Sequence, residues 1–394
     1  MELSEQQVEE CREVARQILG HSRVFFPFFV LHDFTHSENV CRNLSELTGL
    51  FGIKGWELNL LKMAAYLHDI GMALPPLVID ELNINIESVL RDIKPEHQRK
   101  VRERINCFSR FIENNYVKLS KHALTAREEA ARLVRLLHPF ISSSFIRRHL
   151  RDKLDVKLLQ EVELLCRYHN SKTPIPSSDK RFRRLVMALR LADSMDFTWA
   201  RGKYFFETAW KQYLPEVTDQ LKHWVFKLSV KDVRVRGDSI MVKVSENASR
   251  ASVLGVLLFE VANNFYEDWQ EISSRGEPRV VVSKGVSQVE VTGIIEALNS
   301  AYKRVVLGWS GFDSGREFER ICKELEGAVE SEILDMLKRA NRRWRMEKCA
   351  PEVSIFDALA LATIKDVDTN HVVDRILNTC VGTPVRERIK NLLR

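Results

Sequence analysis

Two histidines and two aspartates in the amino-terminal half of the chain have the residue types of a divalent-metal site. His36 stands alone, His68 and Asp69 are adjacent, and Asp193 follows much later. Neutral imidazoles and carboxylates make a mixed nitrogen and oxygen ligand set, which suits Mn, Ni, Co, Fe or Zn better than Mg. The seven cysteines are scattered and never spaced as CxxC, so no thiolate cluster is predicted beside them. We therefore expect His36, His68, Asp69 and Asp193 to bind a divalent metal ion.

The spacing of apolar residues predicts the helices that carry the first three of these positions. Thr35 and Glu38 have the spacing of a capping box, which predicts a helix that starts there with His36 in its first turn. That histidine shares a face with the apolar residues that follow it. In the segment 57–69, His68 lies on the apolar face at the helix end, and the adjacent aspartate lies about 100° further round.

Asp193 falls on the apolar stripe of a third predicted helix, together with Leu189, Ala192 and Asp196. This placement carries a carboxylate towards the apolar interior. An isolated buried carboxylate is costly, whereas one that binds a metal or is paired is not. The stripe therefore supports a ligand role for Asp193.

The pattern as a whole predicts a mainly α protein with a small α+β unit. A chain of 394 residues exceeds the usual size of one hydrophobic core, so two or three units are expected. Helical spacing predicts a metal-binding helical domain over 1–205. Alternating apolar residues predict an appended unit of antiparallel hairpins over 206–295, and helical spacing returns in a C-terminal region of unknown role over 296–394.

The appended unit is predicted in more detail as two hairpins on either side of a helix. The expected elements are a strand through Trp224, Phe226, Leu228 and Val230, a turn at 236–239, a strand through Ile240, Val242 and Val244, a helix over 249–272, and a second hairpin of 279–282 and 289–292 that turns near Gly285.

Composition sets limits on compartment and partners. The formal net charge of +6 comes from 60 basic and 54 acidic residues of interspersed sign, so it permits an anionic partner without requiring one. The charged, amphipathic N-terminus does not have the pattern of a signal peptide, and the apolar stretch 24–31 is too short to span a bilayer. Seven scattered cysteines without the pattern of a disulfide framework are typical of a protein in a reducing compartment. We expect a cytoplasmic protein without a membrane partner.

Three blocks that contain the candidate ligands resemble the superfamily of HD-domain metal-dependent phosphohydrolases. The blocks are HSENV at 36–40, AAYLHDIGM at 64–72 and LRLADSMD at 189–196. All three occur in the family's order, and the resemblance covers roughly residues 20 to 300. HDIGM and the trailing α+β unit look most like the HD-CE type of domain. The resemblance implies an HD-type helical bundle and a metal-dependent hydrolase of phosphoesters.

The resemblance also implies a second metal in some members, held by histidines between the HD pair and the final aspartate. His138 and His169 occupy that interval. His169 closes a helix and lies on its apolar face, where it is either a second-metal ligand, a phosphate-contacting acid or a core histidine. His138 is expected to end its helix, because Pro139 disfavours continuation. Pro139 also departs from the glycine that is frequent there in the family.

Several neighbours of the motifs are candidates for work on the substrate. We predict catalytic roles for Asp69, His169 and Arg190. The predicted substrate-binding residues are His138, Lys172, Arg190 and Arg201. The remaining histidines in this part of the chain, His32, His97, His122 and His149, are predicted to lie at the surface.

The chemistry expected from such a site is hydrolysis of a phosphoester, because a divalent ion lowers the pKa of bound water from 15.7 towards about 7 and polarises a phosphoryl oxygen. A nucleotide or nucleotide-like small molecule is the expected substrate. One alternative is a nuclease on single-stranded nucleic acid, which the basic tract 338–345 with Trp344 would bind. Another is a regulatory or interaction protein with a structural or vestigial metal site. A homo-oligomer is compatible with all three.

Overall fold

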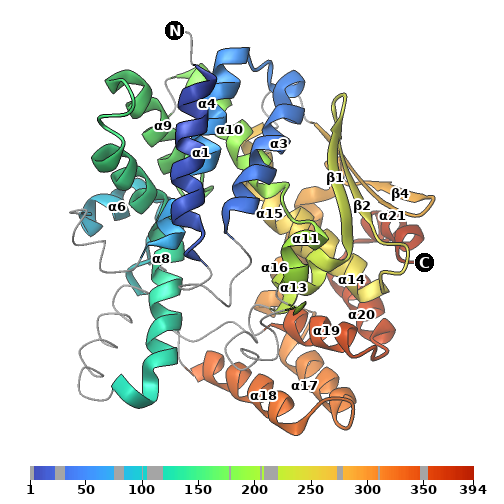
Figure 1. Ribbon diagram of the computed structural model, residues 1–394. Helices are drawn as coiled ribbons and strands as arrows, with labels where there is room; N and C mark the ends of the chain where they lie inside the picture. The colour runs from blue at the N-terminus through green and yellow to red at the C-terminus, as the bar shows by residue number, and fades with distance from the viewer. Residues whose placement is uncertain are drawn as a thin grey trace. The chain divides into compact units, whose positions relative to one another are not determined.

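The computed structural model describes residues 4–22, 32–74, 84–99, 101–103, 119–176, 179–204, 206–207, 221–272, 278–308, 311–346 and 354–394. Contacts within the chain group it into two compact units, Met1–Asp196 and Phe197–Arg394. Figure 1 shows helices throughout and one small sheet. The predicted fold class, mainly α with an appended α+β part and C-terminal helices, is confirmed. The boundaries at 205 and 295 stay predictions.

The first unit is a bundle of helices around one buried helix. Its described helices are α1 (Glu5–Leu19), α3 (Phe34–Phe51), α4 (Gly55–Leu67), η1 (Ile70–Ala73), α6 (Ile86–Asp92), α8 (Leu119–His149), α9 (Val156–Tyr168) and α10 (Lys180–Ser194). Every residue of α4 from Met63 to Leu67 is buried, and the helix contacts α1, α3, α9 and α10. A helix that is apolar all round belongs in a core, so α4 is the axis on which the unit is built.

Two predicted helix ends in this unit are wrong. The helix around His36 is capped by Asp33, whose side chain accepts from the amides of Thr35 and His36, and not by Thr35. A nearby aspartate is the stronger N-cap, so the helix begins at Phe34. Helix α8 also continues past His138 to His149, with Pro139 inside it. Packing of α8 against α9 and η1 outweighs the local cost of the proline.

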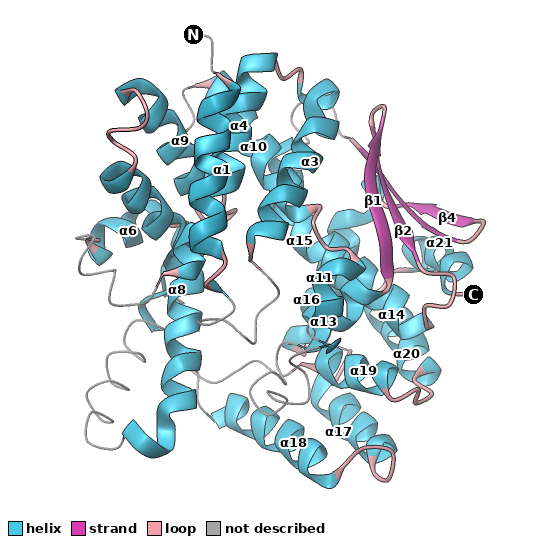
Figure 2. Ribbon diagram, viewed as in Figure 1, coloured by secondary structure: helices cyan, strands magenta, loops and turns pink. Residues whose placement is uncertain are grey.

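The second unit has a four-stranded mixed sheet with helices packed on it (Figure 2). The strands β1 (Val230–Arg236), β2 (Ser239–Val244), β3 (Arg279–Lys284) and β4 (Ser287–Glu290) lie in the order β1-β2-β3-β4. Both hairpins are antiparallel, as expected, and β2 pairs with β3 in parallel. The turn at Gly237 and the turn at Gly285 both need positive φ, which glycine adopts without strain.

The described helices of the second unit flank the sheet in sequence. They are α11 (Trp199–Tyr204), α13 (Leu221–Leu228), α14 (Arg250–Gly255), the π-helix η4 (Val256–Asn263), α15 (Asn264–Ile272), η6 (Thr292–Ile294), α16 (Ile295–Leu307), α17 (Ser314–Leu325), α18 (Ser331–Met346), α19 (Ile355–Ile364), α20 (Asn370–Cys380) and α21 (Thr383–Leu393). The segments α14, η4 and α15 are consecutive and together confirm the helix expected over 249–272. Within the described residues, none of the helices combines the length and apolar character that a membrane crossing needs.

The strand predicted through Trp224, Phe226 and Leu228 is wrong, because these residues belong to helix α13. This short helix packs against both α11 and α19. Apolar side chains therefore lie on several faces of this helix. Residues at alternate positions are then buried, which gives the same sequence pattern as a strand. Only the last residue of the predicted segment, Val230, lies in β1.

Substitution of Gly71 tests how closely the segment after His68 and Asp69 packs against α8. A Cβ at this position would lie 2.5 Å from the carbonyl oxygen of His138 and 3.0 Å from Ile141 Cβ on α8. Gly71→Ala should therefore cost about 1 to 3 kcal/mol of unfolding free energy by overpacking. Gly49→Ala is the matched control, because nothing lies within 4 Å of its Cβ position. Urea unfolding of both variants measures the effect, and equal stabilities would contradict the packing argument.

Candidate metal centre

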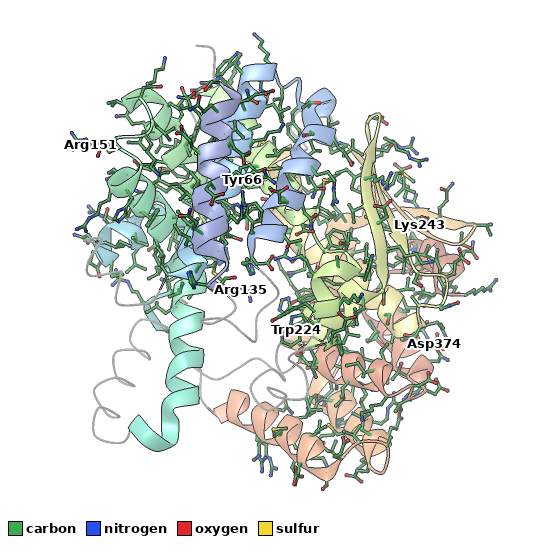
Figure 3. All side chains as sticks on the ribbon, in the orientation of Figure 1. Tyr66, Arg135, Arg151, Trp224, Lys243 and Asp374 are labelled. Carbon is green, nitrogen blue, oxygen red and sulfur yellow. The ribbon has the colours of Figure 1, made fainter. Side chains whose placement is uncertain are left out.

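His36, His68, Asp69 and Asp193 meet in the interior of the first unit. Figure 3 labels Tyr66, two residues before His68. The Nε2 atom of His36 lies 3.4 Å from Asp69 Oδ2 and 3.1 Å from Asp193 Oδ1. The Nε2 atom of His68 lies 3.3 Å and 4.0 Å from the same two oxygens. Helices α3 and α10 and the end of α4 thus bring all four predicted metal ligands together.

A second group of ligand atoms shares the Asp69 carboxylate. Its other oxygen, Oδ1, lies 3.3 Å from His138 Nε2 and 3.8 Å from His169 Nε2. The ligand atoms of Asp69, His138 and His169 lie within 4.8 Å of one another, as do those of His36, His68 and Asp69. The two histidines come from α8 and from the end of α9. Asp69 therefore faces one pair of imidazoles with each of its oxygens.

The hydrogen bonds at the Nδ1 atoms fix the tautomer of all four histidines. His36 Nδ1 donates to Asp196 Oδ2 at 2.6 Å. The other three donate to the carbonyl oxygen three residues earlier in their own helices: His68 to Ala65 at 2.7 Å, His138 to Arg135 at 2.7 Å and His169 to Cys166 at 2.6 Å. An imidazole that donates from Nδ1 presents the lone pair of Nε2 when it is neutral. All four Nε2 atoms therefore face the Asp69 carboxylate as potential ligands.

Pro139 explains how a histidine in the middle of a helix obtains this bond. Proline has no amide hydrogen, so it cannot donate to the carbonyl four residues earlier, which is that of Arg135. This carbonyl instead accepts from His138 Nδ1. His68 and His169 follow the last residues of α4 and α9, where carbonyls lack helical donors. The departure from the family pattern at residue 139 therefore supplies the acceptor that orients His138.

Electrostatics in the cluster favour charged carboxylates and neutral imidazoles at His138 and His169, whereas the pKa of His68 is raised, because the charges of Asp69 and Asp193 outweigh the effect of its burial. Burial alone would raise the pKa of Asp69, but the charges of His68 and His32 and the closeness of the His36 and His68 rings hold it well below its usual value. The pKa of Asp193 is lowered as well, against the effect of burial, chiefly by His36, whose Nε2 lies 3.1 Å from its carboxylate. Burial lowers the pKa of His138. Burial and the nearby charges of His68 and His138 lower that of His169 to about 3.

The residues fit a divalent cation. The buried Nε2 of His68 has no hydrogen-bond partner among the described residues. The Nε2 atoms of His138 and His169 lie 3.0 Å apart, and two neutral imidazoles that both donate from Nδ1 have no hydrogen to share there. Ligand bonds of about 2.0 to 2.1 Å to one ion are compatible with that separation. An ion would satisfy these lone pairs and offset the charge of Asp69.

The predicted substrate residues divide between different surroundings. Arg190 is buried, with 1% of its surface exposed, and donates to the carbonyl oxygens of Tyr168, Asn170 and Thr173. These bonds hold the segment that contains His169 in place. The described contacts of Arg190 are therefore those of a residue that positions His169. Lys172 lies in the same segment, where its amide donates to Asn170 and its carbonyl accepts from Lys94. Arg201 is buried in the second unit, and its predicted role stays a prediction.

Sequence reasoning missed two residues at the site. The ring of His32 lies 5.6 Å from that of His36 and is partly exposed, so this histidine borders the site, which the sequence did not predict. His32 precedes the N-cap Asp33 and lies outside helix α3, so helical spacing could not have placed it. Asp196 was placed on the correct stripe, but its bond to His36 spans 160 residues of sequence. His149 is exposed as predicted, His97 is half-buried, and the His122 side chain lies outside the described residues.

Comparison with known proteins gives one match. Residues 26–272, more than half of the chain, match the family model described as HD-CE. No curated protein and no solved structure matches the chain. The matched region contains every candidate ligand in both groups.

Acidification should destabilise the metal-free protein through His169. The pKa of about 3 in the folded state is below the ordinary histidine value of about 6.5. Between these values the unfolded chain binds the proton and the folded chain does not, so stability falls as the pH falls from 6.5 towards 3. One such proton changes the unfolding free energy by about 1 kcal/mol per pH unit. Urea unfolding in EDTA should show that His169→Asn reduces this slope, and parallel pH profiles would refute the assignment.

Asp196 should control metal affinity without being a ligand. Its carboxylate accepts from His36 Nδ1 and from Asn39 Nδ2 at 3.1 Å. Asp196→Asn keeps the shape but weakens the charge-assisted bond, and loss of such partners typically lowers metal affinity about 10- to 100-fold. Competition for Mn or Co against a chelator measures this. Asp152→Asn, at an exposed position, is the control, and unchanged affinity in Asp196→Asn would show that the bond is not needed.

Proposed function

This chain belongs to the HD-CE family, and on that premise we propose that it is a metal-dependent phosphohydrolase. Its proposed substrate is the phosphoester of a nucleotide or a nucleotide-like small molecule. The observation that carries the proposal is the position of Asp69, whose two carboxylate oxygens each face a pair of imidazole Nε2 atoms. This arrangement supports binding of one divalent ion, and the His138 and His169 pair supports a second.

The protein's own groups have three tasks in this proposal. His36, His68, Asp69 and Asp193 bind the ion, which supplies Lewis acidity that polarises a phosphoryl oxygen and lowers the pKa of water. The Nδ1 bonds to Asp196 and to backbone carbonyls hold the imidazoles in the neutral, ligand-ready tautomer. Burial of His36, His68 and Asp69 excludes bulk water, which strengthens each electrostatic contact.

The lowered pKa of His169 and the position of its Nε2 atom support a ligand role over a role as a general acid. A general acid must hold its proton near the working pH. The pKa of His169 is lowered to about 3, first by burial and then by neighbouring imidazoles. A neutral imidazole with its Nε2 directed at Asp69 is suited to bind a cation. We therefore propose His169 and His138 as ligands of a second ion, with catalysis dependent on Asp69.

Substrate approach is best supported at Asp193. The side chain of Asp193 is 32% exposed, whereas those of His36, His68 and Asp69 are at most 3% exposed. A phosphate group that reaches the ligands from solvent would therefore arrive beside Asp193. The predicted substrate contact of Lys172 stays part of this proposal, His138 is now proposed as a metal ligand, and Arg190 is proposed to act through the His169 segment. The role predicted for Arg201 stays a prediction.

The other hypotheses receive less support from the described residues. In the basic tract proposed for a nuclease, Lys338 forms an ion pair with Glu326 at 2.7 Å, so one of its charges is already paired. The complete ligand set argues against a vestigial site. The five described cysteines are buried thiols, which is consistent with the proposed cytoplasmic location.

Turnover of a substrate panel tests the proposal. The purified protein should hydrolyse a nucleotide or a generic phosphodiester with Mn, Ni, Co or Fe, and Asp69→Ala should lose about 100-fold or more of this activity because both ion sites lose their shared ligand. Asp152→Ala, at an exposed position, should retain it. Phosphate release measures the reaction.

No turnover with any metal would contradict the enzyme hypothesis. Cleavage of single-stranded oligonucleotides alone, with no hydrolysis of mononucleotides, would favour the nuclease instead.

A further inference from the structure

A cavity of about 560 Å³ lies within the second unit, away from the candidate metal ligands in sequence and unit. Its walls come from the start of α14, the end of β3, and helices α20 and α21, which contact one another within this unit. Figure 1 shows these helices beside the sheet, near the carboxyl end of the chain. Its volume is in the range of about 300 to 1,000 Å³ that small-molecule sites have.

Positive charge predominates around this cavity. Five basic side chains line it, namely Arg250, Lys284, Arg386, Lys390 and Arg394, together with one carboxylate, that of Asp374. Asp374, labelled in Figure 3, pairs with Arg250. Glu387 lies beside the cavity and pairs with Lys390 at 2.6 Å. The basic side chains therefore exceed the adjacent acidic side chains by three, and this surplus of positive charge favours binding of an anion.

Two of the basic groups are held in place by the fold. Lys284 Nζ donates to the carbonyl oxygen of Ala248 at 3.0 Å, and Arg386 donates from one terminal nitrogen to Asn378 Oδ1 at 3.0 Å. The Nε atom of Arg386 is buried without a hydrogen-bond partner among the described residues. Glu387 Oε1 lies 3.7 Å from it, which is too long for a hydrogen bond. Because this atom is buried, an anion in the cavity would have to contact a terminal nitrogen of Arg386 and not Nε.

The remaining lining residues indicate the kind of anion. Leu377 and Leu393 are buried and add an apolar surface, while Asn370 and Asn378 add amide groups. No aromatic side chain is among the described residues that line the cavity. Nonspecific single-strand binding uses aromatic stacking along an extended groove, so the lining favours a compact ligand. Arginine and lysine together are the usual partners of phosphate oxygens.

We propose that this cavity binds a soluble organic phosphate of about nucleotide size, with its phosphate groups on Arg386, Lys390 and Arg394. The site is separate from the metal centre and does not depend on the proposed hydrolase activity. It gives the C-terminal helices, to which the sequence assigned no chemistry, a role in ligand binding.

Calorimetric titration of the full chain in EDTA tests this site, with pyrophosphate and ATP as probes. One molecule should bind per chain, more weakly at high salt. Lys390→Gln with Arg394→Gln should weaken binding about tenfold or more, because charge-assisted hydrogen bonds are lost. Lys231→Gln with Lys243→Gln is the matched control, since both lysines are exposed outside the cavity and the net charge changes equally. Arg386→Gln is a second cavity variant, and circular dichroism checks that all variants fold.

Three results would overturn the proposal. Equal weakening by the cavity and control pairs would show nonspecific attraction. Loss of binding in Asp69→Ala, with binding retained in folded cavity variants, would place the phosphate at the metal centre. Binding of an oligonucleotide, but not of pyrophosphate or ATP, would indicate a nucleic-acid surface. Because the assay measures binding without metal, it is independent of whether the protein turns over a substrate.

Discussion

The buried carboxylate of Asp69 is the constraint on which the first unit depends. Only 3% of this side chain is exposed, and a charged carboxylate in the interior is costly unless opposite charge and hydrogen-bond donors surround it. His36 and His68 face one oxygen, and His138 and His169 face the other. Helices α3, α4, α8 and α9 must therefore converge on a single side chain, so the packing of the bundle and the formation of the site are the same event.

Backbone carbonyls determine which nitrogen of each imidazole at the site carries the hydrogen. Three of the four histidines donate from Nδ1 to a carbonyl three residues earlier, and each of these carbonyls lacks its usual helical donor. At two positions the helix ends, and at the third Pro139 removes the amide hydrogen. Helix termination and a helical proline are thus two ways to the same chemical result, a neutral imidazole whose Nε2 lone pair is available to a cation.

Local periodicity predicted the face on which each ligand lies, because the burial of His36 and His68 and the position of the partly exposed Asp193 follow from helical spacing. Periodicity could not predict contacts between residues that are far apart in the sequence. Asp196 meets His36 across 160 residues, and the bonds from Arg190 to the carbonyls around His169 also join segments far apart in sequence, while its predicted contact with a substrate stays a prediction. It also took α13 for a strand, since a short helix buried on several sides has apolar residues at alternate positions too. The sequence also could not show that Pro139 leaves the Arg135 carbonyl free for His138, because this requires that the helix continues past His138.

The metal content of the purified chain tests the central claim most directly. After loading with Mn and removal of free metal, elemental analysis should find two ions per chain, one held by His36, His68, Asp69 and Asp193 and one by Asp69, His138 and His169. Replacing His138 and His169 together should remove one ion and leave the other. A folded protein that retains no metal, or a metal content that does not change in Asp69→Ala, would contradict the account.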